Sequence, residues 1–373
     1  MNVQQTVLER YSAGANEVQT NLCCPVQYDS RLLELLPEEI VAKDYGCGDP
    51  SAYVKPGDVV LDLGSGGGKI CYMAAQLVGA AGRVIGIDMN DDMLALARKY
   101  QDSMAQRLGG NRVRFVKGHI QDLALDVAAM DDYLKQNPVT GSHGLAQLQL
   151  WQNEQRVQKP LIEDNSIDLV ISNCVLNLVA EHEKRQLVRE IFRVLKPGGR
   201  VAISDIVSDE SIPQALKSDP ELWSGCISGA FHEKEFLEAF KSQGFLGVSY
   251  DKWDAEPWQV VDGIEFRSVT LTATKGEQTP CLDIGQAVIY RGPYEQVTDD
   301  EGHIFVRGAR MAVCERTFRY LTTGPLKDDF IAINPAQVKD PLPWCAPAGT
   351  LRPASETKGG NHHAGAKTGS GCC

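Results

Sequence analysis

Short hydrophobic runs alternate with amphipathic segments along the first half of the chain. Apolar runs at 59–63, 83–87 and 113–117 are separated by segments with helical spacing at 69–78 and 91–106. Runs of this kind are typical of strands buried on both faces, and their alternation with helices predicts a parallel sheet. Further strand patterns at 167–172 and 200–206 extend the series, so we expect a doubly wound α/β fold.

The remaining segments of this region complete the expected sheet. Residues 123–162 break the rhythm and are interpreted as a helical insertion. A helix over 181–195 is expected to stop at Lys196-Pro197-Gly198-Gly199, which turns the chain into the fifth strand. A helix follows at 232–243. The segments 245–252 and 266–275 are rich in β-forming residues, and we expect them to close the sheet as an antiparallel pair.

The pattern divides the chain into four parts. Residues 1–50 form an N-terminal helical segment and a loop around Cys47, and residues 51–276 form the large α/β domain. Residues 277–345 are expected to form a smaller α+β domain, with a strand near 287–290 and a helix near 316–321. Residues 346–373 are rich in Pro, Gly, Ser, Thr and His, a composition typical of a disordered tail.

Composition narrows the range of functions. The chain has 373 residues and a formal net charge of −12, which argues against binding nucleic acid through a basic surface. The first 21 residues contain no apolar core of signal-peptide length, and no later run approaches the length of a membrane span. We therefore expect a cytoplasmic protein, acting as a monomer on a small neutral or cationic substrate without nucleic acid or membrane partners.

A glycine-rich loop follows the first predicted strand and indicates a cofactor site. Only glycine lets the backbone turn sharply and approach a ligand closely, but Lys69 stands where the dinucleotide fingerprint requires a further glycine. Asp88, at the end of the second strand, is placed to accept ribose hydroxyls. The buried acid Asp62 suits a cofactor that carries an ammonium group, as S-adenosylmethionine does. We predict that cofactor, bound by Asp62, Gly64, Ser65, Gly66 and Asp88.

Four of the eleven cysteines are expected near the same edge of the sheet. Cys174 follows the fourth strand and Cys226 lies in the crossover after the fifth, and ligands bind at this edge in open α/β sheets. Cys71 begins the helix after the glycine loop, where we expect the helix dipole to lower its pKa. Cys47 lies on the turn before the first strand. The thiols are interpreted as buried core cysteines, a four-thiolate zinc site, or a site for a thiophilic substrate such as trivalent arsenic.

With these motifs in place, the chain resembles the arsenite S-adenosylmethionine methyltransferases between about residues 44 and 320. The cysteine contexts carry the most specific part of the resemblance. The matching segments are Asp44-Tyr45-Gly46-Cys47-Gly48, Leu61 to Gly66 with Cys71-Tyr72-Met73, Gly86-Ile87-Asp88-Met89, Ser172 to Leu178, Ser224 to Gly229, Asp299 to Phe305 and Val313-Cys314.

The resemblance implies a fold, an activity and roles for individual residues. It implies a class I methyltransferase with a Rossmann-like sheet that methylates arsenite and methylarsenite for arsenic detoxification. As(III) would be bound by Cys174 and Cys226 with Cys71 as a third thiolate, and Cys47 would form a disulfide during turnover. A thiol reductant, glutathione or thioredoxin, would then restore the enzyme. Further cofactor contacts are implied for Met89, Ile120, Gln121 and Asn173.

Two other functions are compatible with the same motifs. A methyltransferase acting on carbon or oxygen of a small molecule, such as a quinone precursor, would share the fold and use the cysteines as core residues. A non-catalytic arsenic-binding or metal-binding protein would keep the thiols beside a vestigial cofactor pocket. The intact glycine loop, together with Asp62 and Asp88, favours an enzyme.

Overall fold

The computed structural model describes residues 3–17, 19, 26–277, 279–335, 340–344 and 346–357. These residues belong to two compact units, one extending to Lys275 and the other beginning at Gly276.

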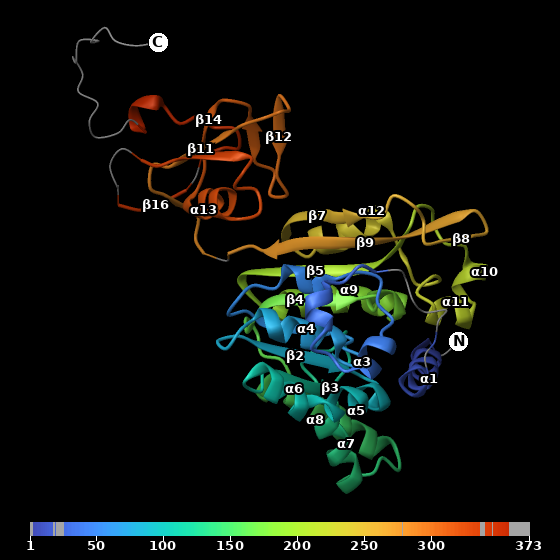
Figure 1. Cartoon of the computed structure of the whole chain (residues 1–373). Helices are drawn as coiled ribbons and strands as arrows, with labels where there is room; N and C mark the ends of the chain where they lie inside the picture. The colour runs from blue at the N-terminus through green and yellow to red at the C-terminus, as the bar shows by residue number, and fades with distance from the viewer. Residues whose placement is uncertain are drawn as a thin grey trace. The chain divides into compact units, whose positions relative to one another are not determined.

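A nine-stranded sheet forms the centre of the first unit, with a main strand order of β3-β2-β1-β4-β5-β9-β7 (Figure 1). Neighbouring strands from β3 to β5 run parallel, whereas β9 runs antiparallel to both β5 and β7. The expected α/β sheet with an antiparallel closing strand is confirmed. The main strands are β1 (Val59–Leu63), β2 (Arg83–Asp88), β3 (Val113–Lys117), β4 (Ile167–Asn173), β5 (Leu195–Ser208), β7 (Phe245–Trp253) and β9 (Ile264–Lys275), to which β6 (Phe231–His232) and β8 (Gln259–Val261) add short pairs.

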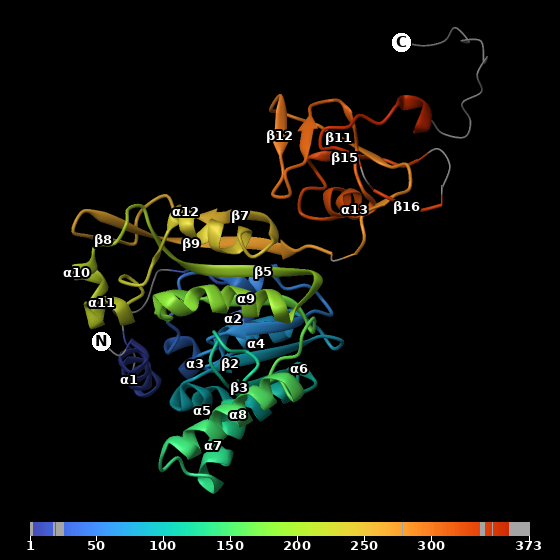
Figure 2. The same ribbon diagram turned by 180° about the vertical axis from the view of Figure 1, so that it is seen from behind.

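Helices cover both faces of this sheet because the strands are apolar on both sides. Leu61 and Leu63 belong to one core cluster, which includes residues of α9 (Lys184–Val194) and α12 (Glu233–Lys241). Val60 belongs to the opposite cluster, and Figures 1 and 2 show the unit from its two sides. The helices with buried residues in that second cluster are α3 (Glu38–Ala42), α4 (Lys69–Leu77), α5 (Asp91–Lys99) and α6 (Gln101–Leu108).

Two expected elements differ in detail from the structure. The helix expected over 91–106 is interrupted at Tyr100, whose backbone leaves the helical region with φ −102 and ψ 1. We expected residues 196–199 to separate the helix from the fifth strand. That boundary is wrong, because β5 already begins at Leu195. Its register with β4 shifts between Ile167 and Leu169, and Gly198 has a φ of 79°. These residues therefore form an irregularity within the strand.

The insertion between β3 and β4 is helical, as expected. It contains α7 (Val127–Gln136) and α8 (Ser142–Gln158), where Tyr133 and Trp151 stack with ring centroids 4.7 Å apart. The remaining short helices of the unit lie near the carboxyl ends of the strands or before β1. They are α1 (Val3–Asn16), α2 (Ser30–Leu33), α3 (Glu38–Ala42), α10 (Gln214–Lys217), α11 (Pro220–Ser224) and the 3-10 turns η2 (Pro50–Tyr53), η3 (Leu176–Leu178) and η4 (Glu181–Glu183).

The second unit is built from small antiparallel sheets and one helix, α13 (Glu315–Thr323). The three-stranded sheet has the order β14-β11-β15, and its core includes Val288, Phe305 and Leu321. The strands of this unit are β10 (Leu282–Asp283), β11 (Ala287–Tyr290), β12 (Gln296–Thr298), β13 (Ile304–Val306), β14 (Arg310–Ala312), β15 (Phe330–Ile333) and β16 (Leu342–Pro343), followed by the 3-10 turn η5 (Ala354–Glu356).

The expectation that the chain is disordered from residue 346 onward is wrong for residues 346–357. Leu351 forms a bridge with Met311, and Arg352 forms an ion pair of 2.7 Å with Asp283, so residues up to 357 pack on the second unit. Residues 358–373 lie outside the described residues, as do Cys23, Cys24 and Cys345. Within the described part of the chain, no helix combines the length and apolar character that crossing a membrane requires.

Candidate active site

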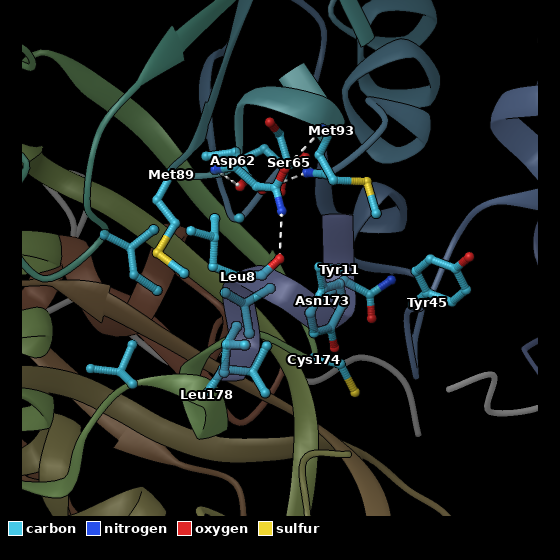
Figure 3. A pocket seen from close by; sticks show the side chains of 18 of the residues that line it. Leu8, Tyr11, Tyr45, Asp62, Ser65, Met89, Met93, Asn173, Cys174 and Leu178 are labelled. Carbon is cyan, nitrogen blue, oxygen red and sulfur yellow. Dashed lines mark hydrogen bonds between the residues drawn. The ribbon is translucent and has the colours of Figure 1, made fainter. Parts of the chain in front are cut away.

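A pocket lies at the carboxyl ends of β1, β2 and β4, where the sequence predicted a ligand. Figure 3 shows side chains from distant parts of the chain around it, with Asp62 and Ser65 toward one end and Cys174 and Leu178 toward the other. All the predicted cofactor residues line this pocket: Asp62, Gly64, Ser65, Gly66, Asp88, Met89, Ile120, Gln121 and Asn173.

The glycine loop is held close to the ends of the strands by backbone hydrogen bonds. The N–H groups of Gly64 and Ser65 donate to the carbonyl of Ile87 at 2.8 and 3.0 Å. Gly64 has a φ of 71°, and a Cβ atom there would lie 2.5 Å from the side chain of Val175. Only glycine satisfies both conditions, because other residues rarely adopt this conformation and none fits the space.

Asp62 presents a buried carboxyl group to the pocket. Burial raises the pKa of Asp62 to about 7, although the Cys71 thiol donates a hydrogen bond to it at 3.2 Å. Nearby, the buried hydroxyl of Ser65 has no hydrogen-bond partner among the described residues. A buried acid of raised pKa and an unpartnered hydroxyl suit the ammonium and carboxylate groups of an amino-acid ligand. These residues therefore fit the amino-acid end of S-adenosylmethionine.

Asp88 stands at the end of β2 with both carboxyl oxygens accepting backbone hydrogen bonds. Burial raises the pKa of Asp88. The backbone N–H groups of Asn90 and Gly66 donate to the carboxyl group at 2.8 and 2.9 Å and partly offset this rise. The Asn90 side chain in turn caps α5 by accepting from Met93. Because the carboxyl is fixed at the pocket wall, its position fits the predicted contact with ribose hydroxyls.

Helix α1 lies against the pocket and connects its two ends. The Asn90 side chain donates to the carbonyl of Leu8 at 3.2 Å, an interaction drawn in Figure 3. On the other side of the helix, Arg10 donates to the hydroxyl of Ser224 at 2.7 Å. Leu8 and Tyr11 line the pocket, so this helix borders both the cofactor residues and the loop that carries Cys226.

Three of the four predicted cysteines meet beside the pocket. Cys47 and Cys174 form a disulfide, and the Cys226 thiol donates to the carbonyl of Cys174 at 3.4 Å. Cys174 and Cys226 both have left-handed backbone conformations, with φ of 59° and 64°. Non-glycine residues seldom adopt this conformation, and those that do are concentrated at functional sites. The sequence prediction that Cys174 and Cys226 converge is therefore confirmed by geometry.

The turn of Cys47 is fixed against the end of β4 by Asn173. The Asn173 side-chain oxygen accepts from the backbone N–H groups of Cys47 and Gly48 at 2.8 and 3.0 Å. A Cβ atom on Gly46 would lie 2.0 Å from the Asn173 side chain, and one on Gly48 would lie 2.4 Å from the Ser204 hydroxyl. The glycines on both sides of Cys47 therefore permit the close approach that brings its sulfur to Cys174.

Cys71 does not join this cluster. Its side chain is fully buried in the core that contains α4, and its thiol faces Asp62. The prediction that the helix dipole lowers its pKa is wrong, because burial and the Asp62 carboxyl raise the pKa of Cys71 well above its usual value. The four sulfurs thus do not form a four-thiolate zinc site in this structure.

Two residues of the site were missed in the sequence. Asp205, within β5, has a carboxyl oxygen within 4.8 Å of the sulfurs of Cys47 and Cys174, and burial raises its pKa to about 7. The phenol of Tyr11 interacts with the Cys226 thiol, which contributes to raising the pKa of Tyr11. The sequence contained a signal for each residue. Asp205 is an acid near the carboxyl end of the fifth strand, and Val7, Leu8 and Tyr11 have the spacing of one face of a helix.

Comparisons with known proteins agree with this architecture. Residues 54–137 and 137–244 match a family model described as a methyltransferase domain, and residues 277–362 match a domain of unknown function. The fold and the pocket define a class I S-adenosylmethionine-dependent methyltransferase.

The particular family follows from longer matches. An arsenite methyltransferase from Aquipseudomonas alcaligenes is 32% identical over 327 residues, covering 83% of each chain. The human arsenite methyltransferase is 29% identical, covering 90% of this chain and 84% of the relative. A crystal structure of an arsenic(III) S-adenosylmethionine methyltransferase from Chlamydomonas reinhardtii is similar with a TM-score of 0.53 and 29% identity, covering 87% of this chain and 100% of that one. The chain belongs to the arsenite methyltransferase family.

Proposed function

We propose that this enzyme methylates trivalent arsenic, arsenite and methylarsenite, at the meeting point of the cofactor pocket and the cysteine cluster. The observation that carries the proposal is the position of Cys174, which lines the pocket and also contacts Cys47 and Cys226. A thiophilic substrate bound at Cys174 is thereby adjacent to a pocket that fits a methyl donor. Soft thiolate ligands suit trivalent arsenic, for which no general base is required.

The cysteines bind and orient the substrate in this proposal. Cys174 and Cys226 exchange with two ligands of As(III), which leave as thiols or water with the thiol protons. When bound, S-adenosylmethionine supplies a sulfonium methyl group to the lone pair of the thiolate-bound arsenic. Binding both partners at one site contributes to the rate by fixing their proximity and orientation. Asp62, Ser65 and Asp88 hold the cofactor in place.

Methyl transfer raises the formal oxidation state of arsenic from III to V, and two thiols return it to III. We propose that the Cys47 thiol attacks the arsenic-bound sulfur of Cys174: the sulfur–sulfur bond forms, the arsenic–sulfur bond breaks and returns its electron pair to arsenic, and Cys47 releases its one proton. Glutathione or thioredoxin then reduces the disulfide by thiol–disulfide exchange. The acidic chain, with a net charge of −12, is proposed to act as a cytoplasmic monomer in arsenic detoxification.

The predicted third thiolate, Cys71, is tested separately from the other ligands. In the structure its thiol donates to Asp62, so ligation of arsenic by Cys71 requires that hydrogen bond to break. Replacing Cys71 by serine preserves a hydroxyl donor for Asp62 and removes the sulfur. Loss of arsenic affinity with retained cofactor affinity would identify Cys71 as a ligand.

The direct test of the function is an arsenic speciation experiment. Purified enzyme, arsenite, glutathione and S-adenosylmethionine are incubated, and arsenic species are separated and counted over time. We expect more than one methylated arsenic per enzyme molecule. Stoichiometric arsenic binding without methylated product would instead indicate an arsenic-binding protein, and methylation of a quinol in place of arsenite would indicate the small-molecule alternative.

A further inference from the structure

Two reduced cysteines lie close together in the second unit. Cys314 is the residue that caps the N-terminus of α13, and Cys281 immediately precedes β10. Strand β10 packs against α13. This contact brings the two cysteines close enough to interact electrostatically, although they are 33 positions apart in the sequence.

The two cysteines differ in their access to solvent. Cys314 is only 3% exposed, and its sulfur accepts from the backbone N–H of Thr317 at 3.4 Å. Cys281 is half-buried, so a ligand can reach the pair from its side. Partial burial and the neighbouring Cys314 raise the pKa of Cys281, so this thiol carries its proton at neutral pH and delivers it when a ligand is exchanged.

Positive charge lies beside the two sulfurs. Arg316 is in the first turn of α13, and it acts on Cys281 through its charge. One end of its guanidinium binds Glu301 at 2.6 Å, whereas its buried Nε atom has no hydrogen-bond partner in the described part of the chain. The pair thus lies next to a cation with an unsatisfied donor, which suits sulfur atoms that become thiolates on binding a ligand.

The backbone segments that carry the thiols are tied together by Gln286. This side chain is completely buried, and it donates to the carbonyl of Val313 at 2.6 Å and to that of Leu282 at 3.3 Å. Val313 and Leu282 are the immediate neighbours of the two cysteines. The two backbone segments are therefore held together by the fold, which favours a ligand that binds both thiols.

We propose that Cys281 and Cys314 form a second binding site, for trivalent arsenicals that carry one carbon substituent. The identity of arsenic as the ligand rests on the proposed function, whereas the dithiol geometry does not. Such an arsenical has two exchangeable bonds: two arsenic–sulfur bonds to small thiols break, two bonds to the cysteines form, and two small thiols leave with the cysteine protons. No electrons are transferred. The site matches the singly methylated product of the first transfer, which needs two thiolates and no third.

Adduct counting with phenylarsine oxide tests this site in the full-length chain. The parent variant carries serine in place of Cys23, Cys24, Cys174, Cys226, Cys345, Cys372 and Cys373, and retains Cys47, Cys71, Cys281 and Cys314. Cys47 belongs to the cluster that contains Cys174 and Cys226, whereas Cys71 lies in the core around α4 with its thiol donating to Asp62, so we expect no adduct on these two thiols. After reduction and desalting, we expect native mass spectrometry to show one phenylarsenic adduct per parent chain, formed from two thiols with release of one water.

Two further variants of the parent decide the assignment. Cys314→Ser keeps a side chain that is favoured at a helix N-cap, and Cys281→Ser replaces a half-buried residue, so both variants should retain the fold of the unit. We expect each to lose the adduct, with an unchanged melting temperature. An adduct that persists in both variants, or no adduct in the parent, would overturn the proposal. Failure of the unmodified enzyme to methylate arsenite would refute the proposed function while leaving the adduct count intact.

Discussion

The phenol of Tyr11 interacts with the Cys226 thiol, and the N-terminal helix that carries Tyr11 contacts a segment far along the chain. Burial raises the pKa of Tyr11, as does the nearby Cys226, so the phenol remains protonated and can donate to the sulfur. The tyrosine therefore holds in position a sulfur that we propose binds arsenic.

Tyr11→Phe removes the hydroxyl that interacts with Cys226 and leaves the ring in place. A net contribution of about 1 kcal/mol predicts a KM for arsenite about fivefold higher, with a smaller effect on kcat. Steady-state kinetics with arsenite at saturating cofactor measures the split. Tyr294→Phe, at a 69% exposed position in the second unit, is the matched control. An unchanged KM in Tyr11→Phe would show that the contact has no role in substrate binding.

Cys226→Ser separates substrate binding from cofactor binding. The thiol lies beside Cys174 but does not line the cofactor pocket. We expect the rate of arsenite methylation to fall by about 100-fold or more, because arsenic loses one of the ligands that position it. Arsenic speciation measures the rate, and calorimetry should show an unchanged affinity for S-adenosylmethionine. Retention of the full rate would remove Cys226 from the site.

Cys47→Ser prevents the disulfide with Cys174. Without any reductant, the unmodified protein in its oxidised state should bind no arsenic at this site, since the sulfur of Cys174 is occupied. The variant keeps Cys174 reduced, so we expect it to bind arsenite without reductant but to produce about one methylated arsenic per chain before stopping. Mass spectrometry counts bound arsenic, and a single-turnover experiment counts product. Sustained turnover by the variant would contradict the role of Cys47.

The raised pKa of Asp62 makes cofactor affinity depend on pH. In the protein without ligand this pKa is about 7, above its ordinary value, so the group is largely protonated below pH 7. A bound ammonium group favours the charged carboxylate and lowers its pKa, so binding releases a proton. Affinity should therefore rise between about pH 6 and pH 8 and level off above the unliganded pKa.

Asp62→Asn tests the source of this pH dependence. We expect affinity to fall by about tenfold at pH 8, and its dependence on pH to become flat between 6 and 8. Isothermal calorimetry in buffers of different ionisation enthalpy measures both affinity and proton release. Asp102→Asn, on the exposed side of α6, serves as the control and should behave like the unmodified protein. Unaltered proton release in Asp62→Asn would assign the titration to another group.

Gly86→Ala places a methyl group between the cofactor loop and the core. The added carbon would lie 2.7 Å from the Cys71 sulfur, 2.8 Å from Phe115 and 2.8 Å from Ser65. We expect destabilisation of about 1–3 kcal/mol and weaker cofactor binding, because these packed side chains must move. Thermal denaturation measures the loss. Gly110→Ala, where the new atom would meet nothing within 4 Å, should leave the melting temperature unchanged.

The cofactor half of the site could be predicted from the sequence because topology alone brings its residues together. Parallel strands end at one edge of the sheet, so Asp62, Asp88 and Asn173 had to meet there once the strands were recognised. Cys174 and Cys226 follow from the same rule. Cys71 does not, because its direction depends on the rotation of α4 against β2, and this rotation turns its thiol into the core beside Gly86.

Residues outside the sheet were harder to predict. Tyr11 reaches the site through contacts made by Arg10 and Leu8, which depend on the tertiary structure and leave only a weak amphipathic pattern. Likewise, the low-complexity composition after residue 346 concealed the ion pair between Arg352 and Asp283. Composition describes the average tendency of a segment, whereas a single half-buried ion pair can fix its position.

The helix α1 also has a practical meaning for anyone who purifies this enzyme. Arg10 donates to the carbonyl of Glu221, 211 positions away, and this helix borders the loop that presents Cys226. An affinity tag fused before Val3, or an antibody bound at that end, would lie close to Cys226 and can disturb the binding of arsenic that we propose there. Assays of tagged enzyme should therefore be compared with assays of the protein after tag removal.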